Sequence, residues 1–416
     1  MKKDYQITFL TEFLVLASQI VVFKLAANFL GNQGFGEYAL ARRTISFAIP
    51  VLLLGMGVGL TRYLAFSSAD SSKAENSYPY FTCAFLIVTT AVSLFLLGLN
   101  LFAKEGAYLF FGDKNYHFLI LPLSLSILGI CFHTLAYSYF RGHLRMLPAN
   151  LLQFINVGII PLAVFALPEI SVSKLFTIMG LLWIVTSGIV IFLISKKIPW
   201  KNFSFNQFKD KSRELLSYGL VRLPGDFGMA ALLTLPATLT AHISGIEKAG
   251  YVAFGISILN LLGTMFTPIG LVLLPKASKM VAQKEFPLLK EHLLKLLKVS
   301  LGVTAIAVIV FELFAPDIIR LYLGEGFEGA VNIFRVILIG ALPYTAYIVL
   351  RSSLDAVYVR PKNVKNILLA LTFFLLVSLG TGSSAYVIFS LCGGLFILGA
   401  FTVYDIHKGL AKQMQI

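Results

Sequence analysis

Long apolar blocks separated by short polar stretches run along the whole chain. About 20 apolar residues in a helix are enough to cross the hydrocarbon core of a bilayer, and each block is close to that length. We therefore expect membrane-spanning helices at roughly residues 7–30, 43–66, 78–102, 117–140, 150–168, 174–195, 215–241, 250–275, 293–314, 331–351, 364–380 and 384–405. The pattern predicts an all-α polytopic membrane protein with about twelve transmembrane helices.

The composition agrees with a membrane protein. Of the 416 residues, 57% are hydrophobic and 13% are charged, whereas a soluble domain carries about 25% charged residues. The net charge of +14 would suit a nucleic-acid partner. However, the basic residues lie mostly in short loops, and no basic and aromatic pattern marks a soluble domain. We therefore expect no binding to nucleic acid.

The distribution of Lys and Arg between alternate loops predicts the orientation. The loops on the side of both termini carry far more basic residues than the loops on the opposite side. Basic loops stay on the cytoplasmic side of a membrane. We therefore expect both termini to be cytoplasmic.

Three loop motifs recur in the same order at nearly the same offset. They are Gly31–Ala39 with Gly245–Ala253, 214 residues apart; Leu109–Asp113 with Leu321–Glu325, 212 apart; and Pro148–Asn150 with Pro361–Asn363, 213 apart. A repeat at a fixed period indicates a duplicated structural unit. Each unit here contains six predicted spans.

The repeat predicts two lobes. We expect an N-terminal lobe at 1–195, a cytoplasmic linker at 196–214 and a C-terminal lobe at 215–416. Because six is an even number, both lobes enter the membrane from the same side and are related by pseudo-two-fold symmetry about the membrane normal. Such a pair of six-helix lobes is suited to alternating access. The linker alternates aromatic residues with lysines, as expected either for a segment on an anionic membrane surface or for a solvated connection.

Ionisable residues inside apolar spans are the candidate functional residues, because each costs about 2.5–3.5 kcal/mol at the centre of a helix. The predicted spans retain Glu12, Lys24, Arg222, Asp226, Glu312 and Arg335. We interpret Glu312 as a solvated residue near the external end of its span. Arg42 and Arg43, at the start of the second span, are either interfacial anchors or part of an external vestibule.

Arg222 and Asp226 are four residues apart, so on a helix they share one face and can pair. Pro224 and Gly225 lie between them and are expected to kink or interrupt the helix. A charged pair at such a point is either a binding element or a structural ion pair.

The repeat also compares the charges of the two halves. An offset of 214 places Glu12 at the position equivalent to Asp226, so both lobes carry a carboxylate there. The basic residues Lys24, Arg222 and Arg335 have no basic equivalent, which favours a functional role. Snorkelling of the side chain toward the interface is the alternative for Lys24 and Arg335.

No catalytic motif is present in the sequence. The chain has no P-loop, HExxH, GxSxG or metal-ligand cluster, and its loops are short, so we expect neither an enzyme nor a metal site. Cys83, Cys131 and Cys392 lie in apolar segments and are interpreted as small packing residues. His133 is interpreted as a hydrogen-bonded packing residue.

Several motifs resemble those of one family. Leu30-Gly31-x-x-Gly34-Phe35-Gly36-x-Tyr38, the glycines at 55, 57 and 59, Tyr218–Asp226, and Leu323–Phe327 together resemble the bacterial polysaccharide (O-antigen type) flippases. These flippases belong to the multidrug/oligosaccharidyl-lipid/polysaccharide exporter superfamily. The resemblance covers nearly the whole chain. Peptidoglycan-precursor flippases of the superfamily typically have two more spans, which this chain lacks by our assignment.

The resemblance implies a function. The expected substrate is an undecaprenyl-pyrophosphate-linked oligosaccharide, moved to the outer leaflet of the bacterial cytoplasmic membrane for surface polysaccharide such as lipopolysaccharide O-antigen. It implies basic cavity residues that meet the pyrophosphate, and only Arg222 and Asp226 are carried over directly. We add Lys24, Arg335, Arg42 and Arg43 as candidate cations.

We further expect Glu12 and Asp226 to carry a coupling proton or sodium ion, with no other cofactor. Expected partners are membrane lipids, the lipid-linked oligosaccharide and other polysaccharide-assembly proteins. Two alternatives stay open. A multidrug antiporter on the same scaffold would favour carboxylates and aromatic residues over cations. A membrane-bound glycan polymerase or ligase would need a larger external loop.

Overall fold

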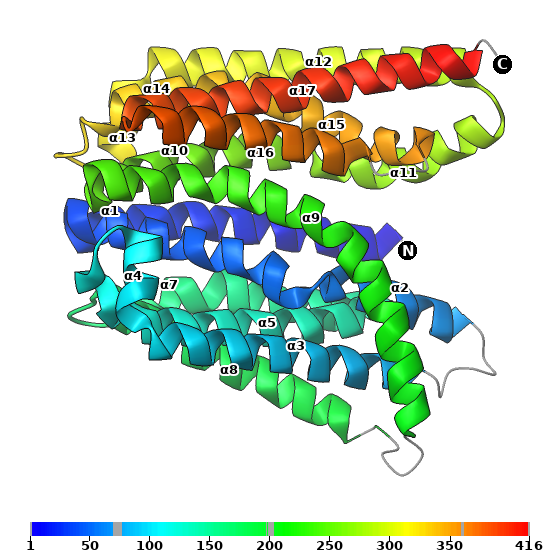
Figure 1. Ribbon diagram of the computed structural model, residues 1–416, viewed down its shortest axis with the longest axis horizontal. Helices are drawn as coiled ribbons and strands as arrows, with labels where there is room; N and C mark the ends of the chain where they lie inside the picture. Colours follow the sequence, from blue (N-terminus) through cyan, green and yellow to red (C-terminus); the bar gives the residue numbers. More distant parts are fainter. Residues whose placement is uncertain (1, 70–76, 197, 199–203, 359–361, 415–416) are drawn as a thin grey trace. The chain divides into compact units, whose positions relative to one another are not determined.

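A computed structural model describes residues 2–69, 77–196, 198, 204–358 and 362–414. Within these residues the chain is built of helices and contains no β-strand, which confirms the predicted all-α class (Figure 1). Internal contacts divide the chain into two compact units, Met1–Asp226 (unit 1) and Phe227–Ile416 (unit 2). The boundary falls inside one long helix.

Unit 1 contains the first eight α-helices, two short helices of other types and the start of a ninth α-helix. They are α1 (Lys2–Leu53), α2 (Met56–Ala69), α3 (Ser77–Leu101), α4 (Ala103–Phe111), the 3-10 helix η2 (Lys114–Leu119), α5 (Ile120–Gly142), α6 (Met146–Gln153), the π-helix η3 (Phe154–Ile159), α7 (Ile160–Val164), α8 (Val172–Ser195) and the first part of α9 (Phe205–Ser244).

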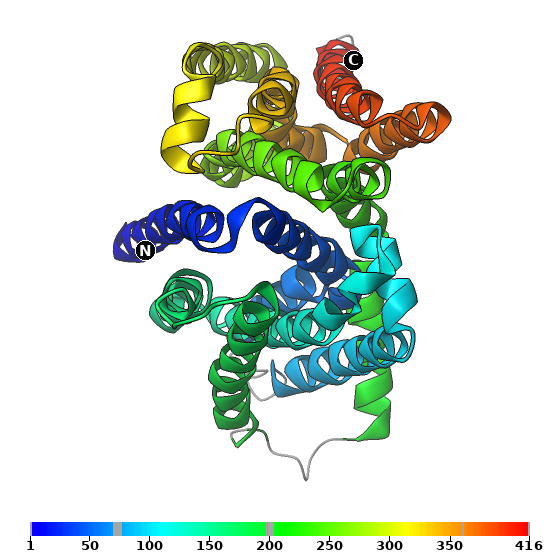
Figure 2. The same ribbon diagram turned by 90° about the vertical axis from the view of Figure 1, so that its left-hand side faces the viewer.

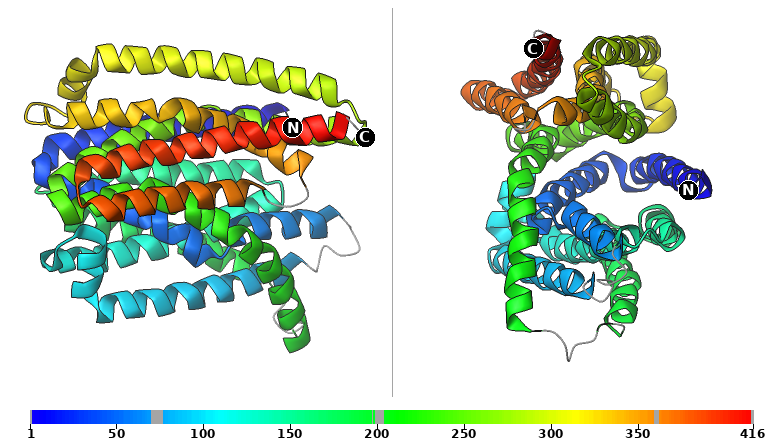
Figure 3. Two further views of the ribbon diagram at one scale, coloured as in Figure 1. Left: turned by 45° about the horizontal axis from the view of Figure 1, so that its top comes forward. Right: turned by 90° about the vertical axis from the view of Figure 1, so that its right-hand side faces the viewer.

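Unit 2 begins within α9 and continues to the last described residues. Its further helices are α10 (Ile246–Thr264), α11 (Thr267–Ala282), α12 (Phe286–Leu313), α13 (Ala315–Tyr322), α14 (Ala330–Ile339), α15 (Ala341–Val357), α16 (Lys362–Thr381) and α17 (Ser384–Met414). Figure 3 shows α16 and α17 side by side within this unit.

Within the described residues, nine helices are long and apolar enough to cross a membrane, and a tenth span results if the bent pair α14 and α15 is taken as one. One of the nine, Gln6–Leu53, has 48 residues. At 1.5 Å per residue this is roughly 70 Å, more than twice the hydrocarbon thickness. It therefore holds more than one predicted span, and helix occupies most of each of the twelve predicted ranges.

The eighth predicted span, 250–275, is not among those nine, and it is broken. It consists of α10, with 19 residues, and α11, with 16, and the helix is interrupted between them. The second span is also broken, between α1 and α2, where Leu54 and Gly55 both have positive φ. Corresponding spans of the two units thus share an interruption.

Two pairs of glycines support the repeat at the level of the backbone. Gly31 has φ 66° and ψ −176°, and Gly245 has φ 87° and ψ 171°. This region is essentially restricted to glycine. Gly112 and Gly324 also both have positive φ. Glycines 214 and 212 residues apart therefore share the conformational demand that a duplicated unit requires.

Glycines allow close contact between helices in each unit. In unit 1, a Cβ on Gly129 of α5 would lie 2.6 Å from the Cβ of Trp183 on α8. In unit 2, a Cβ on Gly399 of α17 would lie 2.6 Å from the carbonyl oxygen of Pro343 on α15. Figure 2 looks roughly along many of the helix axes and shows the bundle formed in each unit. Small residues at such points are typical of helix packing in membranes.

The predicted linker 196–214 differs from the structure in its second half. Residues 205–214 are the first turns of α9 rather than a loop. Residues 197 and 199–203 lie outside the described residues. Polar contacts between α3 and α9 hold this first part of α9 within unit 1.

Candidate functional site

The predicted site residues fall in both units. Unit 1 contains Glu12, Lys24, Arg42, Arg43, Arg222 and Asp226, and unit 2 contains Arg335. The kink of α1 at Gly31 positions Arg42, because it allows its side chain to meet Gln19 from the first half of the same helix.

Arg42 lies in a cluster of neutral polar and aromatic side chains. Its guanidinium donates to the amide oxygen of Gln19 and, at 3.4 Å, to the hydroxyl of Tyr38. It also lies 4.7 Å from the centre of the Phe23 ring, which is cation–π range. Gln19 is fixed in turn, because its amide nitrogen donates to the carbonyl of Val157 at 2.5 Å. Within the described residues, Arg42 is half-buried by uncharged partners that leave its charge unneutralised.

Arg222 does not adopt the predicted pairing. Its guanidinium donates to the hydroxyl of Tyr218, four residues earlier, at 3.3 Å, rather than to Asp226, four residues later. It also lies 5.7 Å from the centre of the Tyr218 ring. Asp226 is exposed and has contacts of its own. The ring and hydroxyl of a tyrosine one helical turn away can compete with a carboxylate for a guanidinium. The spacing of charged residues in the sequence does not show which partner is chosen.

Pro224 and Gly225 do not interrupt α9, which excludes one of the two expected outcomes. α9 continues through both residues from Phe205 to Ser244. Loss of one backbone hydrogen bond at a proline is tolerated in membrane helices, where neighbouring groups satisfy the freed carbonyl. Of the two expected outcomes, only a kink is compatible with the continuous helix.

Arg62, on α2, is a second cation at Tyr218 and was not among the predicted residues. Its guanidinium lies 4.8 Å from the centre of the Tyr218 ring. Arg62 and Arg222, from different helices, thus share one aromatic side chain. The available signal was the position of Arg62 inside the predicted span 43–66.

Polar contacts between α3 and α9 fix the surroundings of Tyr218. Lys211 and Glu214 form an ion pair at 2.9 Å. The hydroxyl of Tyr80 donates to Glu214 and accepts from Lys211 at 3.0 Å. Tyr63 stacks on Tyr80 with centroids 5.1 Å apart and meets Tyr218 edge-on at 6.0 Å. These contacts attach the start of α9 to α2 and α3.

Glu12 and Lys24, both on the first half of α1, are exposed. The guanidinium of Arg141 on α5 supplies an attractive positive charge to Glu12. Nearby, the amide of Asn150 donates to the hydroxyl of Thr8 at 2.9 Å. The positive charge that acts on Glu12 therefore comes from the last turn of α5.

Arg43 and Arg335 have different surroundings. Arg43 is half-buried and has interactions of its own. Arg335 on α14 pairs with Glu312 on α12, with Nε and Oε2 3.6 Å apart, and also donates to the Glu312 carbonyl at 3.3 Å. Glu312 is half-exposed near the end of α12, as interpreted, but its pairing with Arg335 was not predicted. From the sequence the two charges were considered separately, but α12 and α14 are neighbours in the fold and bring them together.

His133 and the cysteines are packing residues, as expected. The buried His133 ring donates from Nε2 to the Gln153 amide oxygen at 2.8 Å, because its Nδ1 accepts from the Asn156 amide at 3.1 Å. Neutral imidazole has one donor and one acceptor, so the ring is satisfied. Cys83, Cys131 and Cys392 are free and buried.

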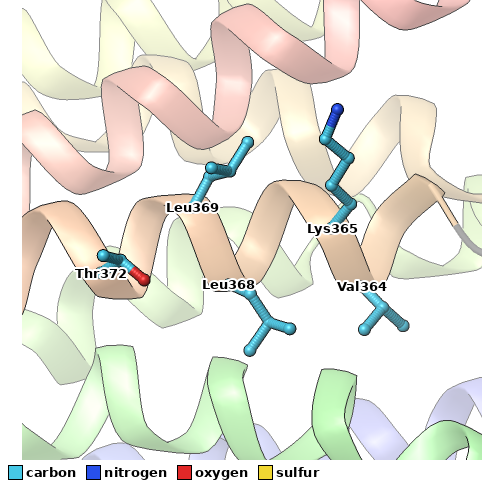
Figure 4. A pocket seen from close by; sticks show the side chains of 5 residues that line it. All are labelled: Val364, Lys365, Leu368, Leu369 and Thr372. Carbon is cyan, nitrogen blue, oxygen red and sulfur yellow. The ribbon is translucent and has the colours of Figure 1, made fainter.

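A shallow, open pocket of about 420 Å³ lies along α16 in unit 2. It is lined by Val364, Lys365, Leu368, Leu369 and Thr372. Figure 4 shows Val364 and Leu368 directed to one side of the helix and Lys365 and Leu369 to the other. Side chains that diverge from one helix do not converge on a ligand, so this pocket is not the candidate site.

Comparison with known proteins identifies relatives. The family described as "Polysaccharide biosynthesis protein" matches residues 2–281. Stage V sporulation protein B of Bacillus subtilis (strain 168) is 22% identical over 352 residues, which cover 78% of this chain. The matched region covers 66% of that relative's own length.

Solved structures share the fold. An inward-facing multidrug resistance MATE family transporter of the MOP superfamily matches with a TM-score of 0.75 and 14% identity, covering 95% of this chain and 96% of that one. A Vibrio cholerae MATE transporter matches with a TM-score of 0.65 and 16% identity, covering 99% and 97%. At this identity the likeness establishes the two-lobe exporter fold.

The family match covers more than half of the chain, and the fold match covers nearly all of it. The family match and the fold match are both consistent with the apolar helices, the repeated glycines and the cations within the helices. The chain is a multi-pass membrane protein that belongs to the polysaccharide biosynthesis protein family and shares the fold of the solved MATE transporters.

Proposed function

We propose that this protein is a flippase for undecaprenyl-pyrophosphate-linked oligosaccharide, which it moves from the cytoplasmic to the outer leaflet by alternating access. The observation that carries the proposal is the half-buried Arg42, whose partners among the described residues are all uncharged. The family match supports a substrate used in polysaccharide biosynthesis.

A pyrophosphate in a low-dielectric cavity needs compensating positive charge, because burying an isolated anion is very costly. Arginine is suited to this role, since its planar guanidinium binds phosphate oxygens in pairs. Arg42 and Arg222 are held by neutral and aromatic groups, which orient the guanidinium and leave its charge available. Arg62 joins them as a third candidate, and Lys24 and Arg43 complete the proposed cationic set of unit 1.

Arg335 has a lesser role in this proposal. The Glu312 carboxylate, 3.6 Å away, already offsets its charge. We propose that it contacts substrate only after that pair separates. The carboxylates Glu12 and Asp226 remain our candidates for carrying a coupling proton or sodium ion. The proposed location is the bacterial cytoplasmic membrane, with both termini cytoplasmic and other polysaccharide-assembly proteins as neighbours.

The test is transport by the purified protein in liposomes. A fluorescent undecaprenyl-pyrophosphate-linked oligosaccharide is placed in both leaflets, and the fraction accessible to an external quencher is followed with time. The wild-type protein should accelerate translocation, and Arg42→Ala should remove most of this acceleration. Translocation unaffected by Arg42→Ala, Arg62→Ala and Arg222→Ala together would rule out the cationic site.

The same liposomes distinguish the antiporter alternative. A multidrug antiporter would move organic cations against an ion gradient and would ignore the lipid-linked sugar. Accumulation of a cationic dye, with no movement of the lipid, would contradict the proposed function.

A further inference from the structure

The short π-helix η3 of unit 1 leaves two backbone carbonyls without their α-helical donors. The N–H of Ile160 bonds to the carbonyl of Ile155, five residues earlier, rather than to that of Asn156. In an α-helix the carbonyl of Val157 would accept from residue 161, which is proline and has no N–H. Carbonyls away from water are nearly always paired, so each of these two needs a donor from elsewhere.

Side chains of two other helices supply both donors. The indole nitrogen of Trp183 on α8 donates to the Asn156 carbonyl at 2.5 Å. The amide nitrogen of Gln19 on α1 donates to the Val157 carbonyl, also at 2.5 Å. The π-helical turn and the proline that follows it thus create the acceptor that holds the side chain of Gln19.

The turn itself is fixed by buried polar contacts. The side-chain amide of Asn156 donates to the hydroxyl of Ser187 at 3.0 Å and to the ring of His133 at 3.1 Å. Its amide oxygen accepts from the hydroxyl of Thr186 at 2.7 Å. Because these partners lie on α5 and α8, both helices hold η3 in place. The carbonyl that Gln19 uses is therefore a rigid point of attachment.

The Val157 carbonyl also decides which way the Gln19 amide points. A carbonyl can only accept, so it selects the NH₂ group and directs the amide oxygen away from η3. That oxygen accepts from the guanidinium of Arg42, which can only donate. The reversed amide would set two acceptors against each other at one end and two donors at the other. The amide therefore has one favourable orientation.

A neutral acceptor at this point leaves the positive charge of Arg42 intact. Gln19 and Tyr38 use two of the five N–H groups of the guanidinium, so three remain for a ligand. A carboxylate in place of the amide would also bind the guanidinium but would offset its charge, as Glu312 does for Arg335. An anchored glutamine thus orients the cation without neutralising it.

We propose that Gln19 is a positioning residue for anion binding: anchored by η3, it holds the guanidinium of Arg42 in place for a pyrophosphate group. This inference rests on the proposed function, in which Arg42 contacts the substrate. Gln19 is uncharged, so the cost of a charge in an apolar span does not mark it in the sequence.

The test is binding of inorganic pyrophosphate to the purified, detergent-solubilised protein. It is measured as the rise in melting temperature over an NaCl control of equal ionic strength, because a ligand of the folded state raises that temperature. We expect saturable stabilisation of the wild type and its loss in Arg42→Ala. Gln19→Leu should weaken the apparent affinity by about tenfold, the lower end of the range for a charge-assisted hydrogen bond.

Gln19→Glu separates positioning from packing. Glutamate has the same length and keeps an acceptor for Arg42, so it would preserve pyrophosphate binding if Gln19 served only as a structural acceptor. We expect instead a loss at least as large as in Gln19→Leu, because the carboxylate offsets the charge of Arg42 and cannot donate to Val157. If Gln19→Leu fails to fold, Gln19→Glu carries the test.

Gln33→Leu is the matched control. Gln33 also lies on α1, but it is exposed and bonds to Glu37 at 3.2 Å. The same change of side chain should there leave the affinity for pyrophosphate unchanged. In liposomes, adding Gln19→Leu to Arg42→Ala should not slow translocation further, because Gln19 acts through Arg42. Further slowing would show that Gln19 acts elsewhere and would overturn the inference.

The outcomes separate this inference from the proposed function. A full pyrophosphate response in both Gln19 variants, with its loss in Arg42→Ala, would overturn the positioning role and leave the proposed function standing. Normal affinity in Gln19→Glu alone would also overturn it, because any acceptor would then suffice. A response unchanged in Arg42→Ala would contradict the proposed function and the inference with it.

Discussion

Single arginines in this protein differ in what surrounds them. Arg42 is held by an amide oxygen, a phenol and an aromatic face, whereas Arg335 lies beside a carboxylate. Neutral partners fix the direction of a guanidinium while leaving its field intact. A carboxylate partner offsets that field. The same residue type is therefore ready for an anionic ligand in one place and partly neutralised in the other.

This difference predicts unequal effects of two alanine substitutions. A charge-assisted hydrogen bond is worth about 1.5–3 kcal/mol, which is roughly a 10- to 100-fold change in rate or affinity. Arg42→Ala should slow translocation of the lipid-linked sugar by that order, and Arg335→Ala should slow it by less than about threefold on the same reasoning. Initial rates in liposomes at equal protein density measure both. Equal losses in the two variants would show that partner charge does not matter.

Arg62 gives a second test at the residue scale. It meets the same Tyr218 ring as Arg222, so removal of either arginine should weaken transport by about tenfold, the lower end of the range for a charge-assisted contact. Arg145→Ala is the control, because Arg145 also lies near an aromatic ring, Phe140, but follows the end of α5. Its transport rate should stay within error of the wild type. A normal rate for Arg62→Ala would remove this residue from the site.

Sequence reasoning identified most of the charged candidates but not their partners. The cost of a charge inside an apolar span identifies Arg222 and Arg335 from hydropathy alone, whereas Arg42 was noted only at the start of the second span. It does not say that Arg222 turns to Tyr218 rather than Asp226, or that Glu312 faces Arg335. Those choices depend on side-chain rotamers and on which helices become neighbours, and neither is encoded in the spacing of residues along one helix.

At the scale of elements, glycine sets where helices end. Gly31 separates the two halves of α1, and Gly245 precedes α10, both with positive φ and ψ near 180°. No atom lies within 4 Å of a Cβ built at either position. The demand for glycine there is therefore a matter of backbone conformation and not of space.

Alanine at either position should therefore destabilise the protein. A residue with a side chain in this region costs of order 1–3 kcal/mol. Gly31→Ala and Gly245→Ala should each lower the melting temperature in detergent. Gly188→Ala, in α8 with equally open surroundings, is the control. Because glycine weakens a helix interior by roughly 0.5–1 kcal/mol, this change should be neutral or stabilising. A melting temperature unaffected in Gly31→Ala would contradict the backbone argument.

A second element-level prediction concerns the contact between α9 and the break before α2. A Cβ on Gly219 would lie 2.0 Å from the carbonyl oxygen of Leu54, a backbone atom that cannot rotate away. Gly219→Ala should separate the two elements and lower the melting temperature by more than Gly59→Ala. In the latter, the nearest atom is Tyr218 Cδ1, at an ordinary 3.4 Å. Similar melting temperatures for the two variants would mean that this contact is not maintained.

Hydropathy predicted the helices well but not their interruptions. Apolar length fixes where a chain crosses lipid, and helix occupies most of each predicted range. The break between α10 and α11 falls inside an apolar block, and α9 extends ten residues into the predicted linker. Both depend on packing and polar contacts, such as those of Lys211 and Glu214, that hydropathy does not register.

At the scale of the whole molecule, the glycines follow the repeat whereas the basic residues do not. The glycines recur in both halves, so the scaffold is shared. Lys24, Arg222 and Arg335 have no basic equivalent, so the proposed substrate site would rest on differences between the halves. Carboxylates occur at the repeat-equivalent positions of Glu12 and Asp226, and an ion-coupled transporter needs groups that can take up and release a cation during its cycle.

This assignment predicts a specific loss of coupling. In liposomes with an imposed proton or sodium gradient, wild-type translocation should exceed the rate without a gradient. Glu12→Gln and Asp226→Asn should keep the gradient-free rate but lose the stimulation, because an amide cannot carry the ion. Glu105→Gln is the control, since Glu105 forms only an exposed ion pair with Lys114 at 3.5 Å. If both variants retain full stimulation, the coupling ion is carried elsewhere.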